Sequence, residues 1–364
     1  MKITIFGLTL SSSWGNGHAT PYRALIRALH RQRARVTFYE RDVPYYSAHR
    51  DFTACEYCSL ELYSEWSDIR GRVLQQVRDS DVVITASYFP DGARVNDEIL
   101  DLAGPLRIFY DLDTPITLSQ LASGPLDYLR RDQMPGFDLY LSFTGGKLLV
   151  RLQEEYGVRM ARPLYGCVDP DAYFRVPARA EFASALSFVG TYAADRMEGI
   201  TDLFLEPARQ RQGTQFLLAG SLYPREWRWP ANVRRYEHVA VHQHPALYSS
   251  SGATLNLTRR QMAESGYCPS GRFFEAAACG TPILTDWWEG LDSFFDVEHE
   301  VCIVRNTADV LAQLDAPATQ MREAGQRARE RTLEEHTGER RANELLAHCD
   351  EAFRGRASAV EASA

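Results

Sequence analysis

One acidic side chain, that of Glu275, lies in a run of small and apolar residues at positions 271–281. The run predicts a short helix that ends at Gly280, then a turn at Pro282 that leads into a buried strand. Amides at the start of such a helix can bind a phosphate, and a carboxylate on it can bind the hydroxyls of a ribose. The segment therefore predicts a site for a nucleotide-sugar.

A second candidate is the loop at residues 11–21, in which His18 follows Gly15, Asn16 and Gly17. Ligands of doubly wound sheets bind at the carboxyl ends of strands, and this loop follows the first expected strand. Glycines let the backbone turn tightly beside a ligand, and a neutral histidine at a helix start suits a general base. Alternatively, the loop is a simple turn whose histidine only caps or packs. Its spacing differs from the dinucleotide fingerprint GxGxxG.

Two acids, Asp111 and Asp113, follow the strand expected at residues 106–110. The carboxyl ends of parallel strands converge, so either carboxylate could orient His18 for proton transfer. Asp113 could equally be a turn or cap residue before Pro115. The pattern leaves the choice between the two acids open.

The other candidates can each present an amide, a hydroxyl or a guanidinium to a diphosphate, and they are Gly190, Thr191, Arg196, Arg259, Ser270 and Arg272. Arg272 precedes Glu275 by three positions, so the two side chains could instead pair on one helix face. Any strand–turn–helix connection can carry glycine and arginine. These residues alone are therefore weak evidence for a diphosphate site.

Composition indicates an ordinary soluble protein, with 45% hydrophobic and 24% charged residues among 364. The formal net charge of −8 argues against nucleic acid as the main partner. The N-terminus does not resemble a signal peptide, and no apolar stretch reaches the roughly 20 residues that cross a bilayer. We therefore expect a cytoplasmic protein without a transmembrane segment.

The seven cysteines are scattered, which favours reduced thiols. Cys55 and Cys58 form a single CxxC pair, but no second pair or histidine cluster completes a zinc site. We interpret the pair as incidental thiols and predict no metal site.

The elements that must hold these residues alternate between strand-like and helix-like segments. The expected strands lie at residues 2–7, 35–40, 81–85, 106–110 and 139–143, and then at 185–189, 215–219, 253–257, 281–284 and 301–304. Short apolar strands separated by amphipathic helices predict parallel sheets covered on both faces. The chain therefore reads as two doubly wound α/β halves.

Turn residues at positions 165–171 mark the boundary between the halves. We predict a first domain at residues 1–168, which would bind an acceptor, and a second at 169–335, which would bind the nucleotide-sugar. A helix at residues 336–353 has an apolar face that could cross back to the first domain, and residues 354–364 are expected to be a disordered tail.

The second half resembles a known family. Residues 255–259 (LNLTR), 266–270 (GYCPS), 272–282 (RFFEAAACGTP) and 286–292 (DWWEGLD) are similar to the CgeB-type, spore maturation protein-like glycosyltransferases. The linker at residues 165–171 and the opening Gly17-His18 are similar to the same superfamily. The resemblance covers most of the chain, is specific in the second half, and is loose in the first.

The resemblance implies a GT-B fold, in which two Rossmann-like domains face a cleft and the second holds most of the nucleotide-sugar. It implies that Glu275 binds the ribose and that Gly190, Thr191 and Arg196 face the diphosphate, with Arg259 and Arg272 as further candidates. It also implies that His18 is a catalytic base that Asp111 or Asp113 orients. The donor would be a co-substrate, most often UDP-linked, and no other cofactor would be needed.

One position departs from the pattern of many retaining members, which carry a second glutamate eight residues before the ribose glutamate. That position is Tyr267 here, so the stereochemical outcome stays open. The preferred hypothesis is transfer of a sugar to the hydroxyl of a small molecule, a glycan or another envelope or natural-product acceptor. The alternatives are a nucleotide-sugar epimerase and a non-catalytic binding protein on the same fold.

Overall fold

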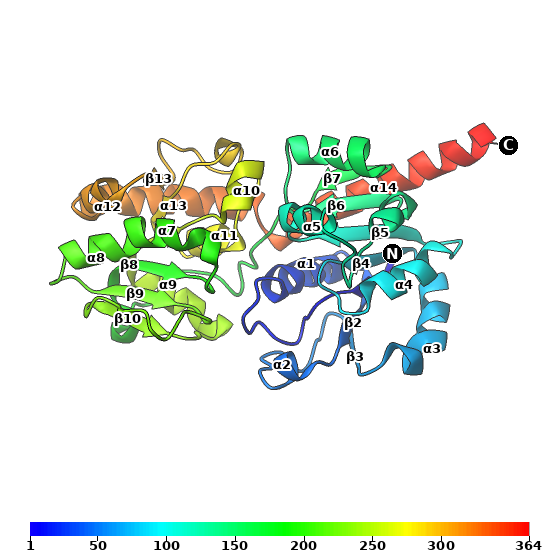
Figure 1. The fold of residues 1–364 in the computed structure, drawn as a ribbon, viewed down its shortest axis with the longest axis horizontal. Coiled ribbons are helices and arrows are strands. Elements are labelled where there is room, and N and C mark those ends of the chain that lie inside the picture. The colour runs from blue at the N-terminus through cyan, green and yellow to red at the C-terminus, as the bar shows by residue number, and fades with distance from the viewer. Residues whose placement is uncertain (364) are drawn as a thin grey trace. The chain divides into compact units, whose positions relative to one another are not determined.

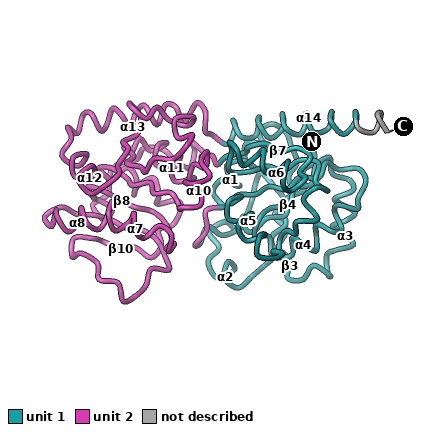
Figure 2. The backbone as a smooth tube through the Cα atoms, turned by 45° about the horizontal axis from the view of Figure 1, so that its top comes forward, with its two compact units in different colours: residues 1–14, 18–165, 338–364 teal, residues 15–17, 166–337 magenta. Residues whose placement is uncertain are grey.

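The computed structural model describes the backbone of residues 1–363 and the side chains of residues 1–358. The chain forms two compact units (Figure 2). Unit 1 contains residues 1–14, 18–165 and 338–364, and unit 2 contains residues 15–17 and 166–337. Each unit has its own parallel sheet.

Unit 1 contains a seven-stranded parallel sheet in the order β3-β2-β1-β4-β5-β6-β7 (Figure 1). Its strands are β1 (Lys2–Phe6), β2 (Arg35–Arg41), β3 (Ser59–Tyr63), β4 (Val82–Ala86), β5 (Leu106–Asp111), β6 (Leu139–Ser142) and β7 (Ala161–Pro163). Its helices are α1 (Ala19–Arg31), α2 (Pro44–Ser47), α3 (Trp66–Arg78), α4 (Gly92–Leu100), α5 (Thr114–Leu121), α6 (Lys147–Tyr156) and α14 (Gly338–Ser363).

Successive side chains of each strand point to opposite faces of this sheet, and both faces are buried. In β1, Ile3 and Ile5 pack into one core cluster together with α1 and α14, whereas Phe6 packs into another with α3 and α4. A sheet covered on both faces explains why its central strands read as continuous apolar runs. The expected parallel α/β architecture is thereby confirmed.

Helix α14 belongs to unit 1 and packs along α1. Its first residue, Gly338, lies so close to α1 that an added Cβ would meet the carbonyl oxygen of Ala24 at 2.5 Å. We expected a disordered tail from residue 354 onward, whereas α14 continues to Ser363 in the described structure. Arg356 donates to the carbonyls of Pro105 and Gly104, which ties this part of the helix to the unit.

Unit 2 contains a six-stranded parallel sheet in the order β10-β9-β8-β11-β12-β13. Its strands are β8 (Ser184–Val189), β9 (Phe216–Ala219), β10 (Val233–Tyr236), β11 (Ser251–Asn256), β12 (Ile283–Thr285) and β13 (Cys302–Ile303). Its α-helices are α7 (Met197–Ile200), α8 (Glu206–Gln210), α9 (His244–Ser250), α10 (Arg260–Ser265), α11 (Gly271–Ala278), α12 (Thr307–Leu314) and α13 (Ala318–Glu335).

The short helix α11 is held by close backbone packing. Ala276, Ala277 and Ala278 are completely buried, and Gly280 ends the helix with a φ of 68°. An added Cβ on Gly325 of α13 would meet the carbonyl oxygen of Gly280 at 2.6 Å. The small residues therefore fix where α11 ends and let α13 pack closely against that end.

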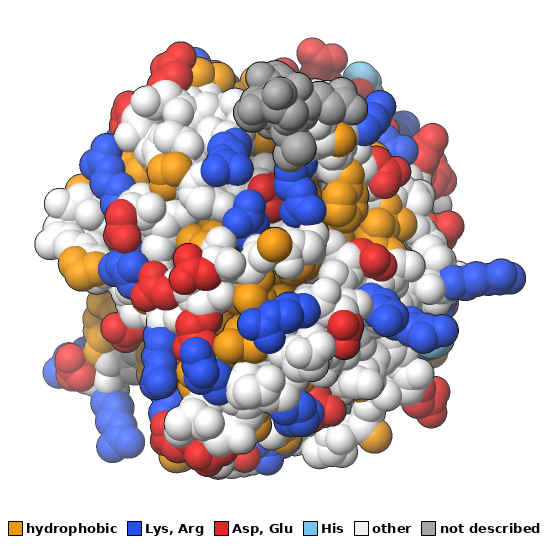
Figure 3. Space-filling view, turned by 90° about the vertical axis from the view of Figure 1, so that its right-hand side faces the viewer, with side chains coloured by type: hydrophobic (Ala, Val, Ile, Leu, Met, Phe, Trp, Pro, Cys, Tyr) orange, Lys and Arg blue, Asp and Glu red, His pale blue; other side chains and the backbone are white. Residues whose placement is uncertain are grey.

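No helix in the described part of the chain is long and apolar enough to cross a membrane. The face drawn in Figure 3 mixes basic, acidic and apolar side chains, with no extended block of one charge. This distribution agrees with the modest net charge of −8.

Candidate functional site

Three arginines gather at the carboxyl edge of the sheet of unit 2. Arg196 lies just before α7, Arg259 is the N-cap of α10, and Arg272 is the second residue of α11. The guanidinium carbons of Arg196 and Arg272 lie 5.4 and 5.1 Å from the ring centroid of Phe188, the buried penultimate residue of β8. The cluster therefore concentrates positive charge next to a buried aromatic ring.

Few groups in the protein neutralise this charge. Arg259 donates to Asp195 at 3.4 Å, Arg272 donates to the amide oxygen of Asn256 at 3.3 Å, and Arg196 donates to the carbonyl of Thr191. Burial and the nearby charge of Arg272 lower the pKa of Arg196 to about 10, and its buried Nε has no hydrogen-bond partner. An anion that accepts from these guanidinium groups would relieve both costs.

The turn after β8 lies against these arginines. An added Cβ on Gly190 would meet Arg272 Nη2 and the Phe188 ring at 3.1 Å. The neighbouring turn after β9 packs tightly against the turn at Gly190. A Cβ on Gly220 would lie 1.9 Å from the carbonyl oxygen of Gly190. The hydroxyl of Tyr223 donates to the same carbonyl at 3.1 Å. Glycine is therefore required at position 220, where an added Cβ would overlap a backbone atom.

Glu275 faces a small group of aromatic and imidazole side chains. The hydroxyl of Tyr248 donates to its carboxylate at 3.5 Å, His244 Nδ1 lies 3.8 Å from it, and Tyr173 also donates to it. Burial raises the pKa of Glu275 to about 7, although the charge of Arg272 and the bonds from Tyr173 and Tyr248 oppose the rise. The side chain keeps 14% of its surface exposed, so the carboxylate remains accessible.

The possible helix-face pair between Arg272 and Glu275 does not form in the described structure. Arg272 turns toward Asn256 and Phe188 instead, while Glu275 faces Tyr248. The two side chains therefore have different partners.

The start of α11 and the segment before it complete this edge. Ser270 is the N-cap of α11, but its hydroxyl forms no capping bond, and the space beside the Cα of Gly271 is open. Tyr267, at a strained φ of 46°, donates its amide to Glu289 at 2.7 Å. Its ring leaves no room for a Cβ on Gly290, which would approach it to 2.4 Å. Tyr267 is therefore a packing residue.

In unit 1, His18 and Asp113 lie together. His18 Nε2 is 4.0 Å from Asp113 Oδ2, and the side chains are 12% and 23% exposed. Tyr88 donates a hydrogen bond to Asp113, and its ring lies 5.3 Å from that of His18. A carboxylate beside an accessible imidazole can orient it and stabilise its protonated form.

Asp111, the other candidate for an orienting acid, accepts hydrogen bonds from its own unit. It is fully buried and accepts from Tyr140 at 2.7 Å, from the hydroxyl of Thr117 at 2.9 Å and from the amide of Asp113 at 3.1 Å. Burial raises its pKa to about 6. Its oxygens hold the turn that carries Asp113.

Two acids that sequence reasoning missed shape the loop before His18. Buried Glu40, near the end of β2, accepts from Leu10 N at 2.7 Å and from Ser11 N at 2.8 Å. Asp51 accepts from the amide of Ser13 at 3.2 Å. The signal for Glu40 was an acid within an apolar strand. Gly15, Asn16 and Gly17 continue this loop, and Gly15 has a φ of 64°.

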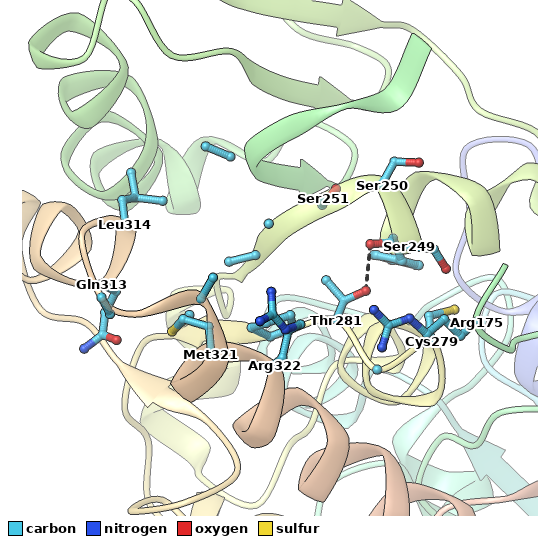
Figure 4. A pocket seen from close by; sticks show the side chains of 18 residues that line it. Arg175, Ser249, Ser250, Ser251, Cys279, Thr281, Gln313, Leu314, Met321 and Arg322 are labelled. Carbon is cyan, nitrogen blue, oxygen red and sulfur yellow. Dashed lines mark hydrogen bonds between the residues drawn. The ribbon is translucent and has the colours of Figure 1, made fainter. Parts of the chain in front are cut away.

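A separate cavity of about 370 Å³ lies at the other edge of the unit 2 sheet, where β8, β11 and β12 begin (Figure 4). Arg175, Ser249, Ser250, Thr281 and Arg322 are among its lining residues. It contains none of the three clustered arginines and is not part of the site described above. Within the described residues, no three His, Cys, Asp or Glu side chains gather into a possible metal site.

One protein-family model matches part of this chain. Residues 196–347 match a family model described as "Glycosyl transferase-like". That segment contains Arg196, Arg259, Arg272 and Glu275. No curated protein matches the sequence.

Solved structures match almost the whole chain. An α-glucosyltransferase in complex with UDP-glucose and DNA has a TM-score of 0.71 at 12% identity and covers 96% of this chain and 99% of its own. Sucrose-phosphate synthase from Thermosynechococcus elongatus has a TM-score of 0.68 at 14% identity, with coverages of 97% and 99%. HepE of Anabaena, in complex with UDP-glucose, has a TM-score of 0.65 at 10% identity, with coverages of 96% and 100%.

The chain has a GT-B glycosyltransferase fold. At these identities the likeness establishes the fold alone. The residues of this chain must therefore support any activity, and three of them, Arg196, Arg272 and Glu275, lie at the sheet edge where ligands of doubly wound folds bind.

Proposed function

We propose that this protein is a glycosyltransferase that moves a sugar from a nucleoside diphosphate sugar, most simply a UDP-sugar, to an acceptor hydroxyl. The observation that carries the proposal is the cluster of Arg196, Arg259 and Arg272 beside the accessible carboxylate of Glu275. Guanidinium groups match a diphosphate, and a carboxylate matches a ribose diol. The matched family model, the fold and the UDP named for several structural neighbours support this choice.

In the proposed reaction, the arginines and Glu275 bind the donor and His18 acts as the base. His18 removes the proton of the acceptor hydroxyl, whose oxygen forms a bond to the anomeric carbon. The bond between that carbon and the diphosphate oxygen breaks, and the arginines stabilise the charge that develops on the leaving diphosphate. We propose that this guanidinium charge suffices without a metal ion.

The proposed family type, acceptor and roles of individual residues follow from the sequence motifs. We propose that the protein is of the CgeB type and acts in the cytoplasm on a small molecule or a glycan. Gly190, Thr191 and Ser270 would contact the diphosphate, and Asp113 would position His18. The formal net charge of −8 supports an acceptor other than nucleic acid.

Calorimetry with UDP, GDP, ADP and UDP-glucose tests donor binding, and chromatography of UDP-glucose with and without a panel of sugar acceptors tests transfer. We expect UDP to bind more tightly than GDP or ADP, and slow hydrolysis of UDP-glucose when no acceptor is present. Failure of all three nucleotides to bind would exclude a nucleotide-sugar enzyme. Conversion of UDP-glucose into a different nucleotide-sugar without an acceptor would instead support an epimerase.

A further inference from the structure

Cys55 and Cys58 lie next to each other in unit 1, on the segment between α2 and β3. Their sulfur atoms are 2.7 Å apart. Nonbonded heavy atoms pack at roughly 3.5–4.0 Å, whereas the sulfurs of a disulfide are about 2.05 Å apart. The backbone of this segment therefore already holds the two side chains in a position from which a disulfide needs only a small movement.

The surroundings favour redox chemistry over metal binding. No third metal-ligating side chain joins the pair within the described residues. Phe52 and Tyr57 pack beside the thiols against the core, under the guanidinium groups of Arg23 and Arg27 at 4.8 and 5.9 Å. Both cysteines are partly exposed, so a small oxidant can reach them.

The segment that carries the pair is bonded to the loop before His18. The amides of Asp51 and Phe52 both donate to the carbonyl of Ser11 at 3.1 Å. The carboxylate of Asp51 accepts from Ser13 and, at 2.6 Å, from Arg23 of α1. A change in the mobility of residues 51–58 is therefore transmitted directly to residues 11–13.

We propose that Cys55 and Cys58 form a reversible disulfide that orders residues 51–58 and, through Asp51, the loop that leads to His18. One thiolate attacks a low-molecular-weight disulfide and releases one thiol. The second cysteine then attacks the mixed disulfide and releases the other thiol. In total, two protein thiols and one small disulfide become one protein disulfide and two small thiols.

The order of attack follows from the surroundings of Cys58. The side chain of Cys58 packs against the core of unit 1, and this burial raises the pKa of its thiol, so it is the poorer initial nucleophile. Cys55 therefore forms the mixed disulfide, and Cys58 resolves it.

The test is a titration of the full-length protein with glutathione buffers from reduced to oxidised, followed by alkylation and peptide mass mapping. We expect the peptide with both cysteines to lose two hydrogen atoms, while Cys302, which is also partly exposed, stays alkylatable. Cys58→Ser should stop at a stable mixed disulfide on Cys55. Cys302→Ser is the matched control and should behave as wild type.

Hydrogen exchange on the same samples tests the structural effect. Oxidation should slow exchange at residues 51–58 and 11–13 by roughly threefold or more in wild type, and not in Cys58→Ser. Free thiols at Cys55 and Cys58 in the most oxidising buffer would overturn the proposal, and so would a disulfide that leaves both segments unchanged. These measurements need no sugar donor, so their outcome is independent of the proposed transferase activity.

Discussion

Arg196 and Arg272 place two positive charges against one aromatic ring, that of Phe188. The repulsion between them adds to the burial that lowers the pKa of Arg196 to about 10. A ligand-free protein bears this cost, and an anion between the guanidinium groups removes it. This arrangement favours binding over stability.

The first prediction concerns Arg272. We expect Arg272→Gln to weaken UDP binding by about 10- to 100-fold, because a charge-assisted hydrogen bond contributes roughly 1.5–3 kcal/mol. The unfolding temperature should change little, because the variant also removes repulsion from Arg196. Calorimetry and thermal unfolding measure the two effects.

Arg322→Gln is a suitable control for that variant, since Arg322 is an exposed arginine of the same unit at the opposite edge of the sheet. It should bind UDP as wild type does. Equal loss of affinity in both variants would mean that net charge, and not the arginine cluster, attracts the nucleotide.

The second prediction uses the pKa of Glu275, which burial raises from 4.5 to about 7. If the ionised carboxylate accepts the ribose hydroxyls, UDP should bind about tenfold more tightly at pH 8 than at pH 6. Protein stability should change in the opposite sense. The contribution of Glu275 to the unfolding free energy is complete below the unfolded pKa and is lost as the pH rises through about 7.

Calorimetry from about pH 6 to 8 tests this pH dependence, with 2′-deoxy-UDP to isolate the contact to the ribose. Glu275→Gln should remove both the pH dependence and the preference for UDP over 2′-deoxy-UDP. A variant that keeps the full preference would show that another residue binds the ribose.

The third prediction distinguishes Asp113 from Asp111. His18→Ala should lower kcat by roughly 10²–10⁴-fold, and Asp113→Asn should lower it less, while UDP affinity stays unchanged in both. Asp111→Ala should instead reduce the unfolding free energy by about 1–3 kcal/mol, because it leaves the buried hydroxyl of Tyr140 without its acceptor. Transfer assays and urea unfolding separate these outcomes. Near wild-type transfer by His18→Ala would remove His18 as the base.

The fourth prediction tests the glycine turns of unit 2. Gly220→Ala places a methyl group 1.9 Å from the carbonyl oxygen of Gly190, so the turn must move. We expect a loss of at least about 2 kcal/mol in unfolding free energy and a clear loss of UDP affinity. Gly213→Ala, whose added Cβ meets nothing within 4 Å, should be neutral in both measurements. Normal UDP binding by Gly220→Ala would show that the Gly190 turn does not contact the diphosphate.

The sequence predicted the central strands of both sheets because buried parallel strands are continuous apolar runs between helical segments. It missed β3, β7 and β10, which lie at sheet edges. The strand β10 (Val233–Tyr236) contains two arginines, and β7 (Ala161–Pro163) has only three residues, so neither carries a clear apolar signal. Helix α14 (Gly338–Ser363) also passes the expected end, and Arg356, beyond that end, bonds to the carbonyls of Pro105 and Gly104.

For the candidate site, the sequence by itself predicted which residues could bind a nucleotide-sugar, because arginine, glycine and glutamate after strands have recognisable chemistry. It could not choose between Asp111 and Asp113, since two residues of the same type two positions apart carry the same local signal. Only the tertiary structure shows that Tyr140 and Thr117 donate to Asp111 while His18 lies 4.0 Å from Asp113, because folding brings these elements together. The orientation of Arg272 could not be predicted from the sequence either. Its side chain points toward Phe188 and not toward Glu275, because segments distant in the sequence pack together there.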